Sequence, residues 1–259
     1  MAANLKHVLT TLAKEGDVNQ MRHLLSTGQQ SPSEETIQNL LTAANKSSQL
    51  EMVTFLLTQY PSVPLNEEIV RSAVNTGSIP IMSALLARDA SLINMQFDMR
   101  GTPLIVACMG RQKVEYLEFM LEAGADPNQD PDAAAFPLAL VAGLYTDPTA
   151  IDLLLQHGAR LESSGALAAA ARRDNEPMMR SLLDRGACSD TDAPAIGTGA
   201  SPLHIAVKAG HVGVARILVQ RGADPHVVDA SGVTAVEVAE QMKGQGKDVS
   251  EMMEVVGGK

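Results

Sequence analysis

Pairs of leucine-like residues recur along the whole chain at intervals of 28 to 36 residues. Such self-similarity is typical of a solenoid, in which each short repeat cannot bury its apolar face alone and stacks on its neighbours. The sequence therefore predicts a stack of repeats. The pairs are Leu24-Leu25, Leu56-Leu57, Leu85-Leu86, Met120-Leu121, Leu154-Leu155, Leu182-Leu183 and Leu218-Val219.

The apolar residues are of the kinds that favour helices. They make up 45% of the 259 residues and are mostly Leu, Ala, Val and Met, with 3% aromatic residues and no Trp. Small and straight-chain side chains lose little rotamer freedom in a helix, so we expect an all-α protein. The two cysteines are too few for a disulfide framework, and no apolar run is long enough to span a membrane. We expect a soluble cytoplasmic protein, and the nucleus stays open as a second location.

The charge is acidic overall, at −10, which argues against nucleic acid as a partner because phosphate binding requires clustered Lys and Arg. No basic residue lies between Lys113 and Arg160. We expect ordinary solvated helix faces there, or alternatively an acidic surface that attracts a basic partner. The acidic residues of this stretch are Glu115, Glu118, Glu122, Asp126, Asp130, Asp132, Asp147 and Asp152.

The seventh repeat has the clearest local pattern. Ser201 can cap a helix whose first residue is Pro202, and Gly210 ends that helix. A second helix follows and stops near Gly222, which can adopt the left-handed conformation. The motifs S-P-L-H-x-A, G-H and G-A-D-P stand in register here, and the repeat resembles an ankyrin repeat.

The resemblance is close in repeats four and seven, while repeats one to three keep only the helix-pair pattern. It implies an all-α ankyrin-repeat solenoid, which we expect to form a single domain over residues 1–259. Its eight helix-pair repeats, the terminal ones degenerate, would cover residues 4–30, 33–62, 66–95, 98–130, 132–162, 163–192, 199–229 and 230–256.

Most residues that might carry chemistry are explained by the repeat. His204, in the S-P-L-H position, is implied by the resemblance to make a structural hydrogen bond near the start of its helix. Cys108 falls on a helix position that favours the core. No phosphate loop, dinucleotide fingerprint, nucleophile elbow or paired-Cys zinc site is found, and no two histidines have metal-ligand spacing. We expect no cofactor, no metal and no catalytic residue.

Ankyrin-like repeats bind through the loops between repeats, called fingers, and through the exposed side of their first helices. This implies a set of candidate partner-binding residues, in which aromatic and Arg side chains rank highest because they dominate binding hot spots. We weigh packing inside the protein as an alternative for Phe97. The candidates are Phe97, Arg100, Arg111, Tyr145, Arg172, Arg173, Asp190, Asp192, Lys208 and His226.

Three functions remain open from the sequence. The first is a non-catalytic scaffold, expected to be monomeric, that binds a partner protein in the groove of the solenoid, away from membranes. The second is a small-molecule binder or enzyme that uses Arg111, Tyr145, Arg172, Arg173 and Asp174 to hold an anionic ligand. The third is a chaperone or subunit for a basic client protein, engaged through the acidic stretch.

Overall fold

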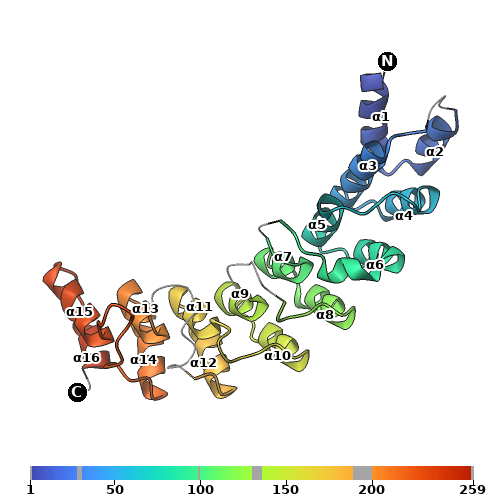
Figure 1. The fold of residues 1–259 in the computed structure, drawn as a ribbon. Coiled ribbons are helices and arrows are strands. Elements are labelled where there is room, and N and C mark those ends of the chain that lie inside the picture. Colours follow the sequence, from blue (N-terminus) through green and yellow to red (C-terminus); the bar gives the residue numbers. More distant parts are fainter. Residues whose placement is uncertain (1, 28–30, 99, 130–135, 189–199, 258–259) are drawn as a thin grey trace. The chain divides into compact units, whose positions relative to one another are not determined.

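The computed structural model describes residues 2–27, 31–98, 100–129, 136–188 and 200–257. Within these residues the chain forms α-helices in consecutive pairs, joined by short turns and by longer loops between the pairs (Figure 1). Two isolated antiparallel bridges, Phe97 with Gly101 and Val228 with Thr234, are the β pairing in the described part of the chain. The all-α ankyrin-type fold expected from the sequence is confirmed.

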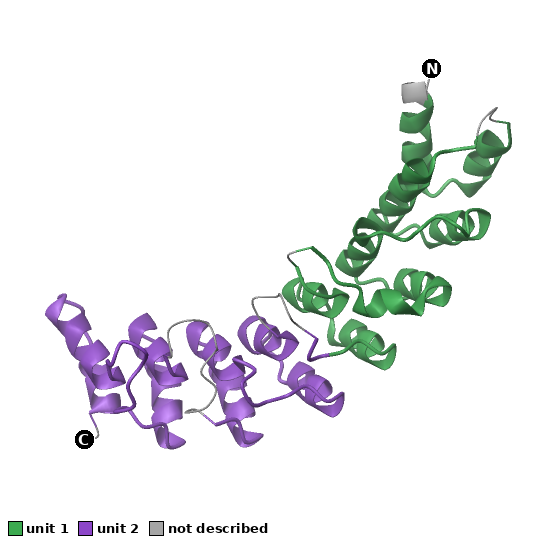
Figure 2. Cartoon of the chain, viewed as in Figure 1, with its two compact units in different colours: residues 1–126 green, residues 127–259 purple. Residues whose placement is uncertain are grey.

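The chain divides into two compact units, residues 1–126 (unit 1) and 127–259 (unit 2), drawn in two colours in Figure 2. The prediction of a single domain stays a prediction. Unit 1 contains α1 (Ala2–Glu15), α2 (Val18–Thr27), α3 (Glu34–Lys46), α4 (Leu50–Gln59), α5 (Glu67–Thr76), α6 (Ile79–Arg88), the 3-10 helix η1 (Ala90–Asn94), α7 (Pro103–Met109) and α8 (Val114–Glu122).

Unit 2 contains four further pairs. They are α9 (Pro137–Leu144) with α10 (Thr149–Gln156), α11 (Ala166–Arg172) with α12 (Glu176–Asp184), α13 (Pro202–Ala209) with α14 (Val212–Gln220), and α15 (Ala235–Gly244) with α16 (Ser250–Val256). The first helices of successive pairs, α9, α11, α13 and α15, pack side by side, and so do the second helices α12, α14 and α16.

The recurring leucine-like pairs supply the core between the helix layers. In six of the seven pairs the first member is fully buried, as Leu154 and Leu218 show. The exception is the first pair, Leu24-Leu25, in which both side chains are half-buried, so that Met21 is the buried residue of α2. Burial of one such side chain per repeat supplies the hydrophobic stabilisation of the stack.

Local signals place the helix starts. Ser201 accepts a hydrogen bond from the His204 amide at the start of α13, and Thr234 forms a capping box with Glu237 at the start of α15. The early repeats, which lack the Thr-Pro-Leu-His motif, are also capped, by Ser33 on α3, by Asn66 on α5 and by Ser78 on α6. These helices are therefore capped although their repeats lack that motif.

Candidate functional site

The ends of the first helices in unit 2 carry four of the ten residues predicted to bind a partner. Arg172 and Arg173 lie at the end of α11, and Lys208 lies in the last turn of α13; all three are exposed. Tyr145 follows α9 and is half-buried. Because α9, α11 and α13 pack side by side, these residues follow one edge of the unit, which we call the first-helix edge.

Side chains from the following repeat hold this edge in place. The Asn175 side-chain amide donates to the Ala142 and Tyr145 carbonyls at 3.0 and 2.7 Å. His211 Nδ1 donates to the Ala171 carbonyl at 2.8 Å. The acceptors are carbonyls at the ends of α9 and α11, so in both cases the following repeat caps the first helix of the one before it.

Unit 1 uses the same device with glutamine. Gln49 donates to the Lys14 carbonyl at 3.0 Å, and Gln112 donates to the Val74 and Asn75 carbonyls at 3.1 and 3.0 Å. Both side chains lie over a glycine with positive φ, Gly16 or Gly77, where an added Cβ would come within 2.4 or 2.2 Å of the glutamine oxygen. Glycine is therefore needed there for conformation and for space.

A row of half-buried apolar side chains crosses the first helices of unit 2. Each member directly precedes a fully buried residue of its helix, which is Val141 in α9 and Ala170, Ala206 or Ala239 in the others. This row was not predicted from the sequence, because apolar residues at these positions are typical of an ordinary helix core. We call it the unit 2 row; it consists of Leu140 on α9, Ala169 on α11, Ile205 on α13 and Val238 on α15.

The remaining residues predicted to bind a partner lie in the fingers or in the turn after α7. Arg100 and His226 are exposed, as a binding role requires. Phe97 is only 4% exposed and its amide pairs with the Gly101 carbonyl, so its placement on the binding surface is wrong and the packing alternative holds. Asp190 and Asp192 lie outside the described residues. Arg111 is exposed in the turn after α7, in unit 1, with a left-handed φ of 51°.

His204 and Cys108, which have potentially reactive side chains, serve the structure of the protein. His204 receives a hydrogen bond from the Ser201 hydroxyl at 2.8 Å and donates through Nε2 to the Val233 carbonyl at 2.9 Å, which confirms its structural role. Cys108 is fully buried, and burial raises the pKa of its thiol to about 12. A thiol of this kind is a core residue and a poor nucleophile.

The acidic residues between Lys113 and Arg160 differ in exposure and in their ion-pair partners. Glu115, Glu118 and Glu122 are exposed on α8. The Asp152 carboxylate instead binds the Arg185 guanidinium through two contacts of 2.6 Å, which lower the pKa of Asp152. Asp130 and Asp132 lie beyond the described residues.

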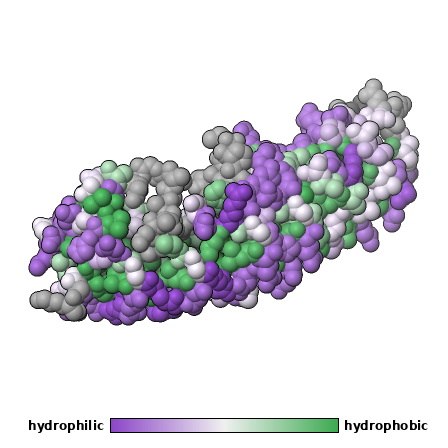
Figure 3. All heavy atoms as spheres, turned by 60° about the horizontal axis from the view of Figure 1, so that its bottom comes forward, coloured by the Kyte–Doolittle hydropathy of each residue, from purple (hydrophilic) through white to green (hydrophobic). Residues whose placement is uncertain are grey.

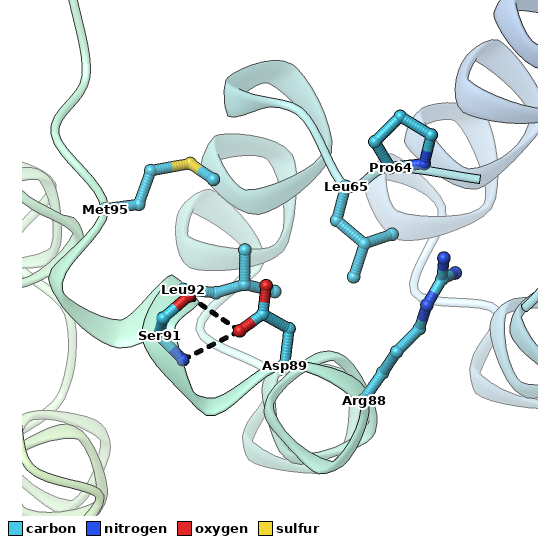
Figure 4. A pocket seen from close by; sticks show the side chains of 7 residues that line it. All are labelled: Pro64, Leu65, Arg88, Asp89, Ser91, Leu92 and Met95. Atoms are coloured by element: carbon cyan, nitrogen blue, oxygen red, sulfur yellow. Dashed lines mark hydrogen bonds between the residues drawn. The ribbon is translucent and has the colours of Figure 1, made fainter. Parts of the chain in front are cut away.

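Two surface hollows add little chemistry. A hollow of about 440 Å³ in unit 1 is lined by Leu65, Leu92 and Met95 together with two charged residues (Figure 4). Asp89 accepts from the Ser91 amide and hydroxyl, and Arg88 donates to the Val63 carbonyl, so both charges serve the local fold.

The second hollow, of about 490 Å³, lies in unit 2 between α13 and the last helix pair and includes Lys208 and Lys247. Neither hollow is lined by Tyr145, Arg172 or Arg173, so the proposed anion pocket gains no support from them. Hydrophobic patches lie between hydrophilic bands on the face drawn in Figure 3.

The described residues provide no arrangement suited to a metal ion or to crossing a bilayer. No three His, Cys, Asp or Glu side chains among them are grouped so that they could hold a metal ion. Their helices also include none with the length and apolar character needed to cross a bilayer.

Comparison with known proteins identifies the repeats. A family model described as "Ankyrin repeats (3 copies)" matches residues 138–229, and one described as "Ankyrin repeat" matches residues 101–131. The ankyrin repeat domain of Bcl-3, described as a member of the IkappaB protein family, has a similar structure, with a TM-score of 0.60 and 21% identity. This match covers 79% of this chain and 97% of that one.

Two relatives share part of the sequence. "Ankyrin repeat and SAM domain-containing protein 6" of Danio rerio is 42% identical over 78 residues, which is 30% of this chain and 10% of that protein. "BTB/POZ domain and ankyrin repeat-containing protein NOOT1" of Medicago truncatula is 31% identical over 86 residues, 33% of this chain and 18% of that protein. The matches thus span less than a fifth of either relative.

Proposed function

Because this chain is an ankyrin-repeat protein, we propose that it acts as a non-catalytic scaffold that holds a partner protein against its first helices and fingers. The observation that supports this most is the difference in burial between two groups of polar residues. His204 and Cys108 are buried in the fold, whereas Arg172, Arg173 and Lys208 are exposed together on one edge of unit 2.

Binding by this edge suits a scaffold because its backbone is fixed before a partner arrives. Asn175 and His211 tie the ends of α9 and α11 to the next repeat, so little conformational entropy remains to be lost on association. Arg side chains on such a rigid surface are frequent binding hot spots. The scaffold therefore presents fixed contacts to its partner without a chemical step.

The test is a photocrosslinking experiment in the native cell. A benzoyl-phenylalanine is placed at Ala209, which is exposed at the end of α13, and separately at Arg216, which is exposed on the second helix α14. We expect specific protein adducts from position 209 that excess unlabelled protein suppresses, and few from position 216. Equal adducts from both positions, or none that competition removes, would contradict the proposal.

A further inference from the structure

The unit 2 row differs from the equivalent positions of unit 1. In α3, α5 and α7 the residue before the core alanine is buried, and it is Ala43, Ser72 or Val106. In unit 2 the same position is half-exposed in all four first helices and aliphatic in each. Exposed apolar side chains that adjoin one another on a soluble protein mark an interaction surface when polar groups border them.

Positive charge borders this row. Arg172 and Lys208 each follow a member of the row by three residues, Ala169 and Ile205, so each pair lies on one face of its helix. Arg173 comes next to Arg172 at the end of α11. The apolar row and the three cations, Arg172, Arg173 and Lys208, together form what we call the unit 2 face.

The cations of the unit 2 face are free to act on a partner. Lys46, the counterpart of Lys208 in α3, pairs with Glu68 at 2.8 Å. By contrast, none of the three cations forms an ion pair with any residue that the structure describes. Three of the five other arginines of unit 2 are paired, Arg180 with Glu176, Arg185 with Asp152 and Arg221 with Asp184.

Acidic groups also lie near the unit 2 face, and two of them, Asp248 and Glu251, line the same hollow as Lys208 and Lys247. Asp229 is close enough to Lys208 for the Lys208 charge to help lower its pKa, but the largest cause is the Val233 amide, which donates to its carboxylate together with the Ser231 amide. Asp174 follows Arg173 in the turn, with a left-handed φ of 55°. The Asp229 and Asp248 carboxylates thus accept hydrogen bonds from backbone amides, whereas the three cations have no ion-pair partner among the described residues.

We propose that the unit 2 face binds an acidic amphipathic segment of a partner protein, with aliphatic side chains on the apolar row and Asp or Glu on the cations. The inference rests on the proposed scaffold function and specifies the partner. Burial of the aliphatic side chains would supply affinity, and the charges would set the orientation and the association rate. Four helices spaced about 9 Å apart give a row about 27 Å long, which matches about eight extended residues or about eighteen helical ones.

The first test is a selection of random 20-residue peptides displayed on phage against the immobilised full chain. We expect the selected peptides to be rich in Asp and Glu spaced between Leu, Ile or Phe. The best peptide is labelled, and its dissociation constant is measured by fluorescence anisotropy. Arg172→Ala and Lys208→Ala should each weaken binding about threefold, and the double variant about tenfold, since each is a solvent-facing charge contact.

Matched variants control this measurement. Arg216→Ala removes an exposed, unpaired arginine from α14 and should leave binding unchanged. Ile205→Asp should abolish most binding, and circular dichroism checks that the helices persist. A peptide with its acidic residues changed to Lys should lose affinity for the native chain and regain it for the Arg172→Glu, Lys208→Glu double variant. Binding should also weaken as salt rises.

The outcomes separate the inference from the proposed function. Selected peptides without acidic residues, or a best peptide that binds the double variant as tightly as the native chain, would overturn the unit 2 face as an acidic-segment site. Crosslinks to a protein at position 209 would still stand in that case. Loss of the crosslinks as well would overturn the scaffold function itself.

Discussion

Replacing Asn175 tests whether hydrogen bonds between repeats stabilise the stack in addition to apolar burial. Its side chain amide donates to two carbonyls of the preceding repeat, at Ala142 and Tyr145, at 3.0 and 2.7 Å. Its oxygen also accepts from the Met178 amide at 3.4 Å and so caps α12. One residue therefore combines a contact between repeats with a contact inside its own repeat.

Two substitutions at this position separate these contributions. Asn175→Ser keeps a hydroxyl that can cap α12 but is too short to reach the preceding repeat. Each lost bond contributes about 0.5–1.5 kcal/mol, so the free energy of unfolding should fall by about 2 kcal/mol. Asn175→Ala also removes the cap and should cost about 0.5–1 kcal/mol more. Ser33→Ala, which removes a cap with no contact to another repeat, is the matched control and should cost about 1 kcal/mol or less.

The assay is urea unfolding followed by circular dichroism, with hydrogen exchange resolved by mass spectrometry. Peptides from the last turn of α9 should lose protection in Asn175→Ser, while peptides from α3 should not. If the urea midpoint of Asn175→Ser equalled that of the native chain, and the α9 amides kept their protection from exchange, the hydrogen bonds between repeats would contribute no stability. The stack would then be held by apolar contacts alone.

Leu154→Ala should lower the free energy of unfolding by about 2–5 kcal/mol, because it leaves a cavity at a fully buried position; a loss below 1 kcal/mol in chemical denaturation would show that α10 is not part of the core. The Arg185 guanidinium lowers the pKa of Asp152 in the folded state. The stabilisation from this ion pair is therefore fully present above the pKa of Asp152 in the unfolded chain, and it is lost as the pH falls through the pKa of Asp152 in the folded chain. Asp152→Asn should therefore cost no more than about 1 kcal/mol at pH 7, since the pair is half-exposed, and nothing at pH 2, as unfolding curves at both pH values will show. In the native chain Cys188 should react quickly with Ellman's reagent and Cys108 only after denaturation, and Cys188→Ser should remove the fast phase. Because α2 buries a single side chain, its amides should exchange before those of all other described helices, and slower exchange than in α12 would contradict this.

The stacking of helix pairs was predictable because its signals are local and periodic. One side chain per repeat must be buried between the helix layers, and Leu56, Leu85, Met120, Leu154, Leu182 and Leu218 are all fully buried where the interval placed them. The role of His204 could be predicted for the same reason, since its partner Ser201 has a fixed place in its own repeat and its partner Val233 a fixed place in the next one.

Features that depend on a particular neighbour were harder to predict. Ser33 and Asn66 are each followed by two glutamates, a cap signal that was readable but was overlooked because the Thr-Pro-Leu-His motif is absent. Phe97 stood in a finger, and its burial follows from how that finger folds back to Gly101. Arg111 and Asp174 adopt the left-handed conformation that Gly210 adopts after α13. The sequence gave no reason to expect this conformation at residues other than glycine.

In the candidate site, too, the sequence predicted the exposure of some residues and not of others. The exposure of Arg172, Arg173 and Lys208 was expected from their place in the repeat, whereas the half-exposure of Ile205 depends on what lies beside it. Ala169 occupies the position in α11 that Ile205 occupies in α13, and an added Cβ on Gly143 of α9 would come within 3.4 Å of the Ala169 Cβ. Helices α9 and α11 thus approach closely through small side chains. An alanine-rich helix is read from sequence as a buried element, yet in this stack it leaves the aliphatic residues on either side partly open to a partner.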